Sequence, residues 1–196
     1  MRFTKMWCVV SAVVLAGAIL TGCGKISRDK RRGIKFSDDN RTLVSYRYEL
    51  PDKSYTVPDG VTEIGRGAFK YARNLETVIL PAGVKGIEAE AFDGCERLTS
   101  ITIPRQSYIG TGTFRGCKSL THVTIPAGVI GIKAEAFAGC ESLESITLPP
   151  GLTSIGYRAF KGCKRLTRVT IPSSVTDIAY NAFDDCPCKA QVRRLR

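Results

Sequence analysis

The chain has 196 residues, which is enough for one domain of ordinary size or for one short array of repeats. Hydrophobic residues make up 43% and charged residues 24%, so most of the chain can bury a core and is not a disordered tail. The 29 Lys and Arg against 18 Asp and Glu give a net charge of +11, and the single His excludes histidine-rich metal chemistry. A chain this basic suits nucleic acids or membranes as partners, so the position of the charge decides between them.

The first 22 residues have the pattern of a signal peptide. Two basic residues precede an apolar run over residues 6–20, which is shorter than the roughly 20 residues that cross a bilayer. The run ends in Leu20-Thr21-Gly22-Cys23, which resembles the lipobox of bacterial lipoproteins. The resemblance implies that Cys23 becomes a lipidated N-terminus, and the Gly24 that follows it resembles the pattern for export to an outer membrane or cell surface. An ordinary secretory signal and a short membrane span are the alternatives.

The basic residues gather at the two ends of the chain. Residues 23–35 hold six basic residues and one acidic residue, and residues 189–196 hold four basic residues. Residues 58–188 are nearly neutral, with 14 basic and 13 acidic residues, so they offer no basic face to nucleic acid. We therefore expect residues 23–35 to be a basic tether near anionic headgroups, where each Lys or Arg contributes about 1 kcal/mol, and residues 189–196 to be a basic tail. Both runs also fit a simpler interpretation as solvated, flexible ends.

Four residue types recur in one phase along residues 58–188. Phe stands at positions 69, 92, 114, 137, 160 and 183, so the spacing is 22 or 23 residues. Pro, Leu and Cys keep the same interval, which indicates a solenoid of stacked units. Within one unit, the alternation that ends at Pro149 predicts a short strand, and the apolar spacing from Ala159 to Cys163 predicts a single helical turn. No unit can bury its apolar residues alone, so stacking supplies the core.

The repeated pattern L-x-x-I-x-L-P-x-x-L-x-x-I-x-x-x-A-F-x-x-C resembles the BspA-like, or Treponema pallidum-type, leucine-rich repeat, and the likeness covers about residues 51–188. It implies a right-handed solenoid that is mainly β, with one short helical turn per repeat and a parallel sheet on the concave face. It also implies exposure at the bacterial cell surface and binding of proteins, often in adhesion to host or microbial surface proteins. A structural protein of the cell envelope without a dedicated ligand is the alternative function.

Two parts of the chain depart from this repeat. The third unit is one residue short between Pro104 and Phe114, so we expect a kink or weaker packing there. Residues 36–57 precede the first full unit, and we expect them to cap the open end of the solenoid. The stretch over residues 34–46 predicts two short strands around a turn rich in Ser, Asp and Asn.

On the predicted strand of each unit, the residues that flank the buried Ile or Val face outward and form two columns. Most of them carry hydroxyl groups, so this face is a candidate docking surface for a protein, although Thr also favours strands without any binding role. The candidate residues are Thr77, Ser100, His122, Ser145 and Arg168 in one column and Ile79, Thr102, Thr124, Thr147 and Thr170 in the other.

The residues do not favour catalysis, a metal or a cofactor. His122 stands alone, and the glycines occupy turn positions rather than a phosphate-binding loop. The repeat cysteines recur once per unit instead of in the clusters that zinc requires, so we expect buried free thiols rather than metal ligands or disulfides. Cys188 lies outside this column and is the best candidate for a reactive or intermolecular thiol, while Cys186 is too close in sequence to bridge to it easily. We therefore expect no enzyme, with a protein and a membrane as partners and no nucleic acid.

Overall fold

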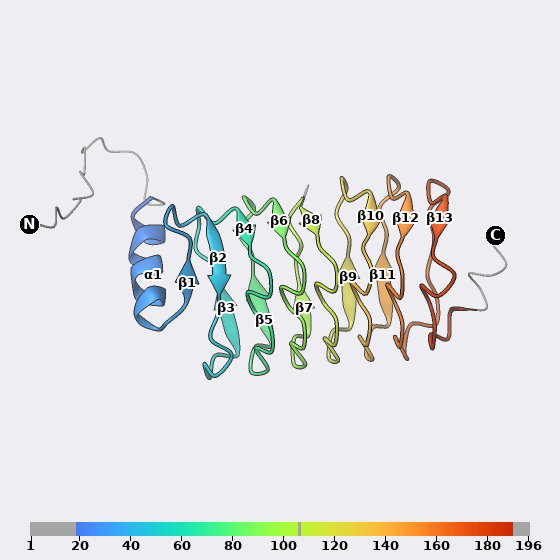
Figure 1. Cartoon of the computed structure of the whole chain (residues 1–196), viewed down its shortest axis with the longest axis horizontal. Coiled ribbons are helices and arrows are strands. Elements are labelled where there is room, and N and C mark those ends of the chain that lie inside the picture. Colours follow the sequence, from blue (N-terminus) through green and yellow to red (C-terminus); the bar gives the residue numbers. More distant parts are fainter. Residues whose placement is uncertain (1–18, 106, 190–196) are drawn as a thin grey trace, which may run out of the picture.

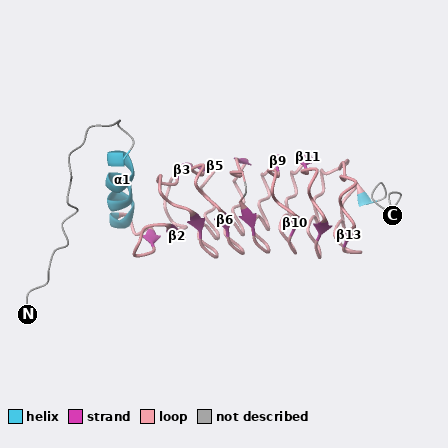
Figure 2. Ribbon diagram, turned by 90° about the horizontal axis from the view of Figure 1, so that it is seen from above, coloured by secondary structure: helices cyan, strands magenta, loops and turns pink. Residues whose placement is uncertain are grey.

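The computed structural model describes residues 19–105 and 107–189. Figure 1 shows one row of similar coils stacked side by side, with helix α1 (Ile19–Arg31) at the N-terminal end. Figure 2, turned by 90°, shows the same single row of coils. Each coil carries short strands that pair in parallel with strands of the neighbouring coils, which confirms the parallel β-solenoid expected from the repeat.

Two strand rows run along the solenoid because each repeat has two short stretches in which buried and exposed residues alternate. The first strand row consists of β3 (Ser54–Thr56), β5 (Thr77–Ile79), β7 (Ser100–Ile101), β9 (His122–Thr124) and β11 (Ser145–Thr147). The second strand row consists of β2 (Thr42–Ser45), β4 (Glu63–Ile64), β6 (Gly86–Ile87), β8 (Tyr108–Ile109), β10 (Gly131–Ile132), β12 (Ser154–Ile155) and β13 (Asp177–Ile178). Pairing in register, as between Val123 and Ile146, stacks the apolar residues of one coil on those of the next.

A column of phenylalanine rings forms the centre of the solenoid. Rings of neighbouring coils are stacked with their centroids 4.9 to 5.5 Å apart and their planes 4° to 15° from parallel. This separation lies in the range that aromatic pairs favour. The column consists of Phe69, Phe92, Phe114, Phe137, Phe160 and Phe183, all of them buried. The even spacing of Phe in the sequence therefore corresponds to a continuous core.

The cysteine column lies beside these rings. Each of its buried thiols donates a hydrogen bond of 3.0 to 3.3 Å to the carbonyl oxygen of the Phe in the preceding coil. These thiols are Cys95, Cys117, Cys140 and Cys163. Burial raises the pKa of Cys95 and of Cys140 to about 12, so both thiols stay protonated at neutral pH. The geometry is that of buried free thiols, as the spacing of once per unit predicts.

The N-terminal segment is more structured than a tether. Residues 24–31 belong to α1, although we expect residues 23–35 to be a flexible or headgroup-bound run. Asp29 is 2% exposed and accepts a 2.7 Å hydrogen bond from the Tyr55 hydroxyl, which links α1 to β3. Burial of a carboxylate is unfavourable unless a hydrogen bond compensates for the lost water. The Tyr55 hydroxyl supplies that hydrogen bond, so Asp29 can be buried where α1 meets the first coil. No helix in the described part of the chain is both long enough and apolar enough to cross a membrane.

The cap is also shorter than the expected residues 36–57. β1 (Lys35–Phe36) and β2 form the antiparallel pair that the sequence predicts, with Asn40 in a left-handed turn conformation between them. The repeat, however, already includes Tyr46, which stands one interval before Phe69 and whose ring lies 5.3 Å from the Phe69 ring. Tyr55 likewise pairs in register with Val78. The first coil is hard to recognise in the sequence because tyrosines occupy positions that hold Phe and Val in later units.

The third unit interrupts both strand rows. Within the described residues, β7 does not pair with β9 and β8 does not pair with β10. Among the described residues, the structure assigns no helix to the expected helical turn of each repeat, which instead consists of hydrogen-bonded turns that carry the phenylalanines. These turns stay joined across the same point, since the amide of Phe114 donates to the carbonyl of Ala136 over 2.8 Å. Ser107 occupies the buried position that Val84 fills one unit earlier, and its hydroxyl donates to the Val84 carbonyl over 2.9 Å. The expected weakness is therefore present in the strands, while the aromatic core passes through uninterrupted.

Candidate functional site

The ten candidate residues lie on one face of the solenoid, formed by the first strand row, and we call this surface the hydroxyl face. Nine of them are exposed and Thr77 is partly exposed. The residue between each outward pair is buried, as Val78, Val123 and Ile146 are. The alternation read from the sequence therefore places these side chains correctly on the surface. Whether they bind a partner stays a prediction.

The structure extends the hydroxyl face at its N-terminal end. Ser54 and Thr56 of β3 are exposed and lie opposite Thr77 and Ile79 in the parallel register, so they continue both columns. They are not among the residues expected on this face, because residues 36–57 are expected to form the cap. The signal that could have found them is Pro58, which stands one repeat interval before the Pro81 that follows β5.

The hydroxyl face is less regular at its C-terminal end than the repeat predicts. Arg168 and Thr170 are exposed, and Val169 between them is buried. The structure nevertheless assigns no strand to this stretch, so the described pairing of the first strand row ends at β11. Thr147 on β11 lies opposite Thr124 on β9, and these two strands form the last strand pair that the structure assigns within the hydroxyl face.

The hydroxyl groups of this face are available to a partner. Within the described part of the chain, none of its Ser and Thr side chains hydrogen-bonds to another described residue. Ile79, which is 52% exposed, is the large apolar member of the face. Arg168 is the Lys, Arg, Asp or Glu residue among the ten candidates, and further charges stand at the border, where Glu76 pairs with Arg97 at 2.8 Å. Such a surface can exchange many hydrogen bonds with a polar partner and exerts little attraction on a strongly charged one.

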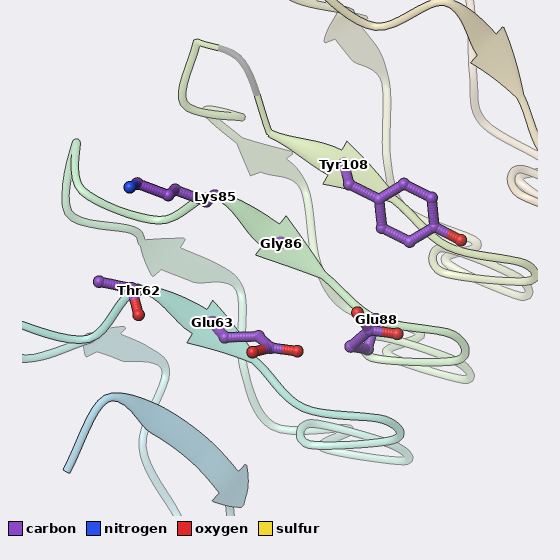
Figure 3. Close-up of a pocket in the computed structure, with 6 residues that line it drawn as sticks. All are labelled: Thr62, Glu63, Lys85, Gly86, Glu88 and Tyr108. Carbon is purple, nitrogen blue, oxygen red and sulfur yellow. The ribbon is translucent and has the colours of Figure 1, made fainter. Parts of the chain in front are cut away.

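A depression of about 340 Å³ lies on the second strand row, between β4, β6 and β8. Figure 3 shows the carboxylates of Glu63 and Glu88 on the same side of the strands, with Lys85 turned away from them. Gly86 leaves this space open, since a Cβ at that position would meet the Glu63 side chain at 3.5 Å. The lining residues are Thr62, Glu63, Lys85, Gly86, Glu88 and Tyr108.

The surroundings of the depression raise the pKa of one of its carboxylates, Glu63. Burial raises the pKa of Glu63, and the neighbouring charge of Glu88 and a hydrogen bond between the side chains raise it further. Glu63 therefore holds a proton, or accepts a hydrogen bond from a donor, more readily than an isolated glutamate in water. Among the described residues, no group of three or more His, Cys, Asp or Glu side chains could hold a metal ion. The depression suits a polar contact with a partner and offers no arrangement of a nucleophile with a base.

A ladder of ion pairs follows the turns that carry the phenylalanines, and we call it the charge ladder. Asp93, whose side chain is 6% exposed, lies 3.1 Å from the Lys70 ammonium and 2.8 Å from the Arg115 guanidinium. Burial raises the pKa of Asp93, but the hydrogen bonds from Arg115 and Lys70 outweigh it and hold the pKa below its usual value. Arg115 reaches on to Glu135, and Lys70 also pairs with Glu90. These charges satisfy one another, so the ladder joins the coils rather than offering a free binding site.

The sequence contains a signal for this ladder. The residue after the repeated Phe alternates in charge along the first three units, as Lys70, Asp93 and Arg115. Residues in one repeat position lie on neighbouring coils, so alternating signs in one column predict ion pairs between coils.

Several predictions fall outside what the structure describes. Residues 1–18, which make up most of the predicted signal peptide, and residues 190–196 of the predicted basic tail are not among the described residues. Cys23 lies within the backbone of α1, but its side chain is not described. The attachment of lipid to Cys23 therefore stays a prediction.

Comparison with known families and structures points to one repeat type. Residues 46–130 match a family model described as the BspA type leucine-rich repeat region, with six copies. A crystal structure of a T. pallidum leucine-rich repeat protein is 26% identical in sequence, with a TM-score of 0.70, over 83% of this chain and 92% of that one. No curated protein matches the sequence significantly.

Two longer crystal structures share the same architecture. A leucine-rich repeat protein from Bacteroides ovatus is 29% identical, with a TM-score of 0.64, over 76% of this chain and 44% of that one. A leucine-rich repeat protein from Eubacterium ventriosum is 25% identical, with a TM-score of 0.62, over 79% of this chain and 48% of that one. The chain therefore spans about half the length of these two relatives.

Proposed function

The repeat region of this chain belongs to the BspA-type leucine-rich repeats, and on this basis we propose that the chain is a bacterial cell-surface protein whose solenoid binds another protein. The observation that carries the proposal is the hydroxyl face, an exposed and regular polar surface along the first strand row. Adhesion to a host or microbial surface protein is the form of binding that best suits a protein displayed on a cell.

The stacked core makes the hydroxyl face a preorganised surface. The in-register strands and the column of Phe rings hold the exposed side chains at the fixed spacing of neighbouring coils. A partner therefore orders few side chains when it binds, and little of the interaction free energy is lost to that ordering. The near absence of charge implies that the partner is recognised by shape and hydrogen bonds.

Binding of purified protein to a panel of immobilised matrix proteins tests this proposal. The soluble protein begins at residue 23 and carries Cys23→Ser, so it keeps residues 24–196 unchanged. We expect saturable binding that the double change Thr124→Lys and Thr147→Lys weakens by about tenfold or more, because two ammonium groups then stand on adjacent strands that carry no Lys, Arg, Asp or Glu. The unfolding temperature of each variant shows that its solenoid is intact.

The matched control is Thr153→Lys with Thr176→Lys. These exposed residues directly precede β12 and β13 on neighbouring coils, so the pair adds the same charge to a different surface. An equal loss of binding in both variants contradicts a role for the hydroxyl face. No saturable binding to any member of the panel favours the alternative function, a structural envelope protein without a dedicated ligand.

The proposed location includes a lipid anchor at Cys23. The lipobox-like end of the signal segment supports it, and the docking of α1 through Asp29 would keep such an anchor close to the first coil. Two or more acyl chains hold a protein firmly on a membrane, whereas one chain holds it only marginally. The basic residues of α1 would then lie near the headgroups of anionic lipids.

Palmitate labelling of the full chain in a bacterial host tests the anchor. Cys23→Ser should abolish the label, while Cys8→Ser, which changes a cysteine within the apolar run, should keep it. A labelled Cys23→Ser protein would show that the anchor is not at this residue.

A further inference from the structure

The last turn of the solenoid holds two thiols that do not follow the cysteine column. Cys186 stands in the column position, yet its sulfur contacts the carbonyl oxygen of Leu166 at 3.3 Å rather than that of a Phe. The sulfur of Cys188 lies 2.8 Å from the sulfur of Cys186. The amide of Cys188 donates to the same Leu166 oxygen over 3.1 Å, so one carbonyl holds both ends of the segment.

This geometry corrects the expectation for the two residues. Their closeness in sequence does not keep the sulfurs apart, and Cys188 is buried beside Cys186 instead of being free to react with other molecules. A disulfide bond is about 2.05 Å long, so only a small further approach separates the two thiols from a bond. Zinc sites of the structural kind need four ligands, and this turn supplies two thiols.

The two thiols differ in acidity. The hydrogen bond from Cys188 lowers the pKa of Cys186, and the same hydrogen bond together with burial raises the pKa of Cys188. A thiolate is the species that attacks a disulfide, so Cys186 is the sulfur that reacts first.

We propose that Cys186 and Cys188 form a reversible internal disulfide by exchange with an external disulfide, which makes the last turn of the solenoid a redox site. The Cys186 thiolate attacks one sulfur of the external disulfide, whose S–S bond breaks and whose second sulfur leaves as a thiolate. Cys188 then loses its proton and attacks the Cys186 sulfur of the mixed disulfide, which expels the other thiolate. Two electrons and two protons pass from the cysteines to the external disulfide, which ends as two thiols.

The position of the pair allows this exchange. The turn that holds the two thiols follows β13 at the end of the described chain. It is held by the Lys189–Asp184 ion pair and by a hydrogen bond that the Lys189 amide donates to the Cys186 carbonyl. Opening these local contacts exposes the sulfurs and leaves the column of Phe rings in place. A ring closed over three residues removes little chain entropy, so the bond changes reactivity more than global stability.

Mass spectrometry of the full chain tests the proposal. The reduced protein is equilibrated with mixtures of reduced and oxidised glutathione, quenched with acid, alkylated while unfolded and digested with trypsin. Residues 169–189 form one tryptic peptide whose only cysteines are Cys186 and Cys188. We expect this peptide to lose both alkyl groups and become two hydrogen atoms lighter as the mixture becomes more oxidising, and to recover in reducing mixtures. Residues 134–158 form a control peptide that contains Cys140 alone and should stay alkylated.

Single variants separate an internal bond from simple thiol reactivity. In Cys188→Ser the second attack is impossible, so glutathione should remain attached to residue 186. Cys163→Ser, which changes a column thiol in the preceding coil, should close the pair as the unchanged chain does. The proposal is overturned if residues 169–189 stay alkylated at both cysteines in every mixture. It is equally overturned if the unchanged chain accumulates the glutathione adduct without the internal bond.

Discussion

The two halves of the solenoid are built from one repeat but end differently. In the half before the break in strand pairing, residues 19–109, the rings of Tyr46 and Tyr55 cover Phe69 at 5.3 and 5.9 Å. In the half after it, residues 110–189, the ring contact of Phe183 in the described part of the chain is with Phe160 alone, at 5.1 Å. A repeat unit is stable through its neighbours, so the terminal unit with fewer of them is the weaker one.

The charge ladder begins in the first half and reaches only the start of the second, since Lys70 and Asp93 lie before the break and Arg115 and Glu135 lie after it. It runs from Lys70 through Asp93 and Arg115 to Glu135, and Ala138 stands where the next charge of the column would be. Helix α1 and its buried Asp29 add a further contact at the N-terminal end. The repeat sequence specifies the stacked interior of both halves, while the cap and the ion pairs of the buried Asp93 distinguish the first half from the second, whose pairs between coils, such as Lys164–Glu141, are more exposed.

Removal of a ring at each end should give the largest contrast. Phe69→Ala deletes a ring with aromatic neighbours on both sides and should cost about 3–5 kcal/mol in the free energy of unfolding. Phe183→Ala deletes a ring stacked on one neighbour and should cost about 1–3 kcal/mol, since the last coil can relax around the gap. Urea unfolding followed by circular dichroism measures both.

Hydrogen exchange locates the damage in each variant. Phe183→Ala should speed exchange of amides in the last coils and leave those of β4 and β6 protected, because repeats contact only their neighbours. Equal losses of stability from the two substitutions would contradict the asymmetry between the ends.

Much of the fold could be predicted from the sequence because its signal is periodic. The interval of Phe residues such as Phe92 and Phe114 predicts a stacked core, and the alternation around Val123 and Ile146 predicts which side chains of the first strand row face outward. Both inferences depend only on the position of a residue within its unit. The structure confirms them for the same reason, since one geometry repeats in each coil.

The parts that could not be predicted depend on single, unrepeated contacts. The docking of α1 requires Asp29 to meet Tyr55, 26 positions away, and no pattern in a basic run indicates a buried carboxylate. The approach of Cys186 to Cys188 depends on the backbone of one turn at Leu166. The depression on the second strand row lies beside Gly86, which has no side chain to fill the space next to the carboxylates of Glu63 and Glu88. Such features are specific to one place in the chain, so periodicity carries no information about them.

Removal of the Asp93 charge at the centre of the charge ladder should lower the stability of the solenoid and make its two halves more alike. The size of this effect should depend on pH. Asp93 has its pKa held below the unfolded value by Arg115 and Lys70, so its contribution is present above the unfolded pKa and is lost as pH falls through the lower, folded pKa. Asp93→Asn should therefore cost about 1–2 kcal/mol at pH 7 and less below about pH 4.

Urea unfolding of both proteins between pH 2 and pH 7 measures this difference. Asp184→Asn is the matched control, since Asp184 occupies the same repeat position and its pKa is lowered by the hydrogen bond from Lys189. That carboxylate is more exposed than Asp93, so the change should have the smaller effect. A gap between Asp93→Asn and the unchanged chain that stays constant across the pH range would contradict the ladder as its source.

Extension of the charge ladder by one more coil into the second half should give the smallest effect and the opposite sign. Ala138 lies in the repeat position of Asp93, between the coils that carry Arg115 and Lys161. Ala138→Asp would share Arg115 with Glu135 in the way that Asp93 shares Lys70 with Glu90, and Lys161 would stand on its other side as Arg115 does beside Asp93.

The expected gain from Ala138→Asp is about 0.2–1 kcal/mol, because the new pairs are partly exposed and screened by water. A thermal melt at low salt should show a rise of a few degrees at most, and about 1 M salt should remove much of it. Ala138→Asn is the control, because it has the same shape without the charge and should not raise the unfolding temperature. A rise that appears equally with Asn would assign the gain to packing, and the second half would then owe its weakness to its uncovered end rather than to the missing charge.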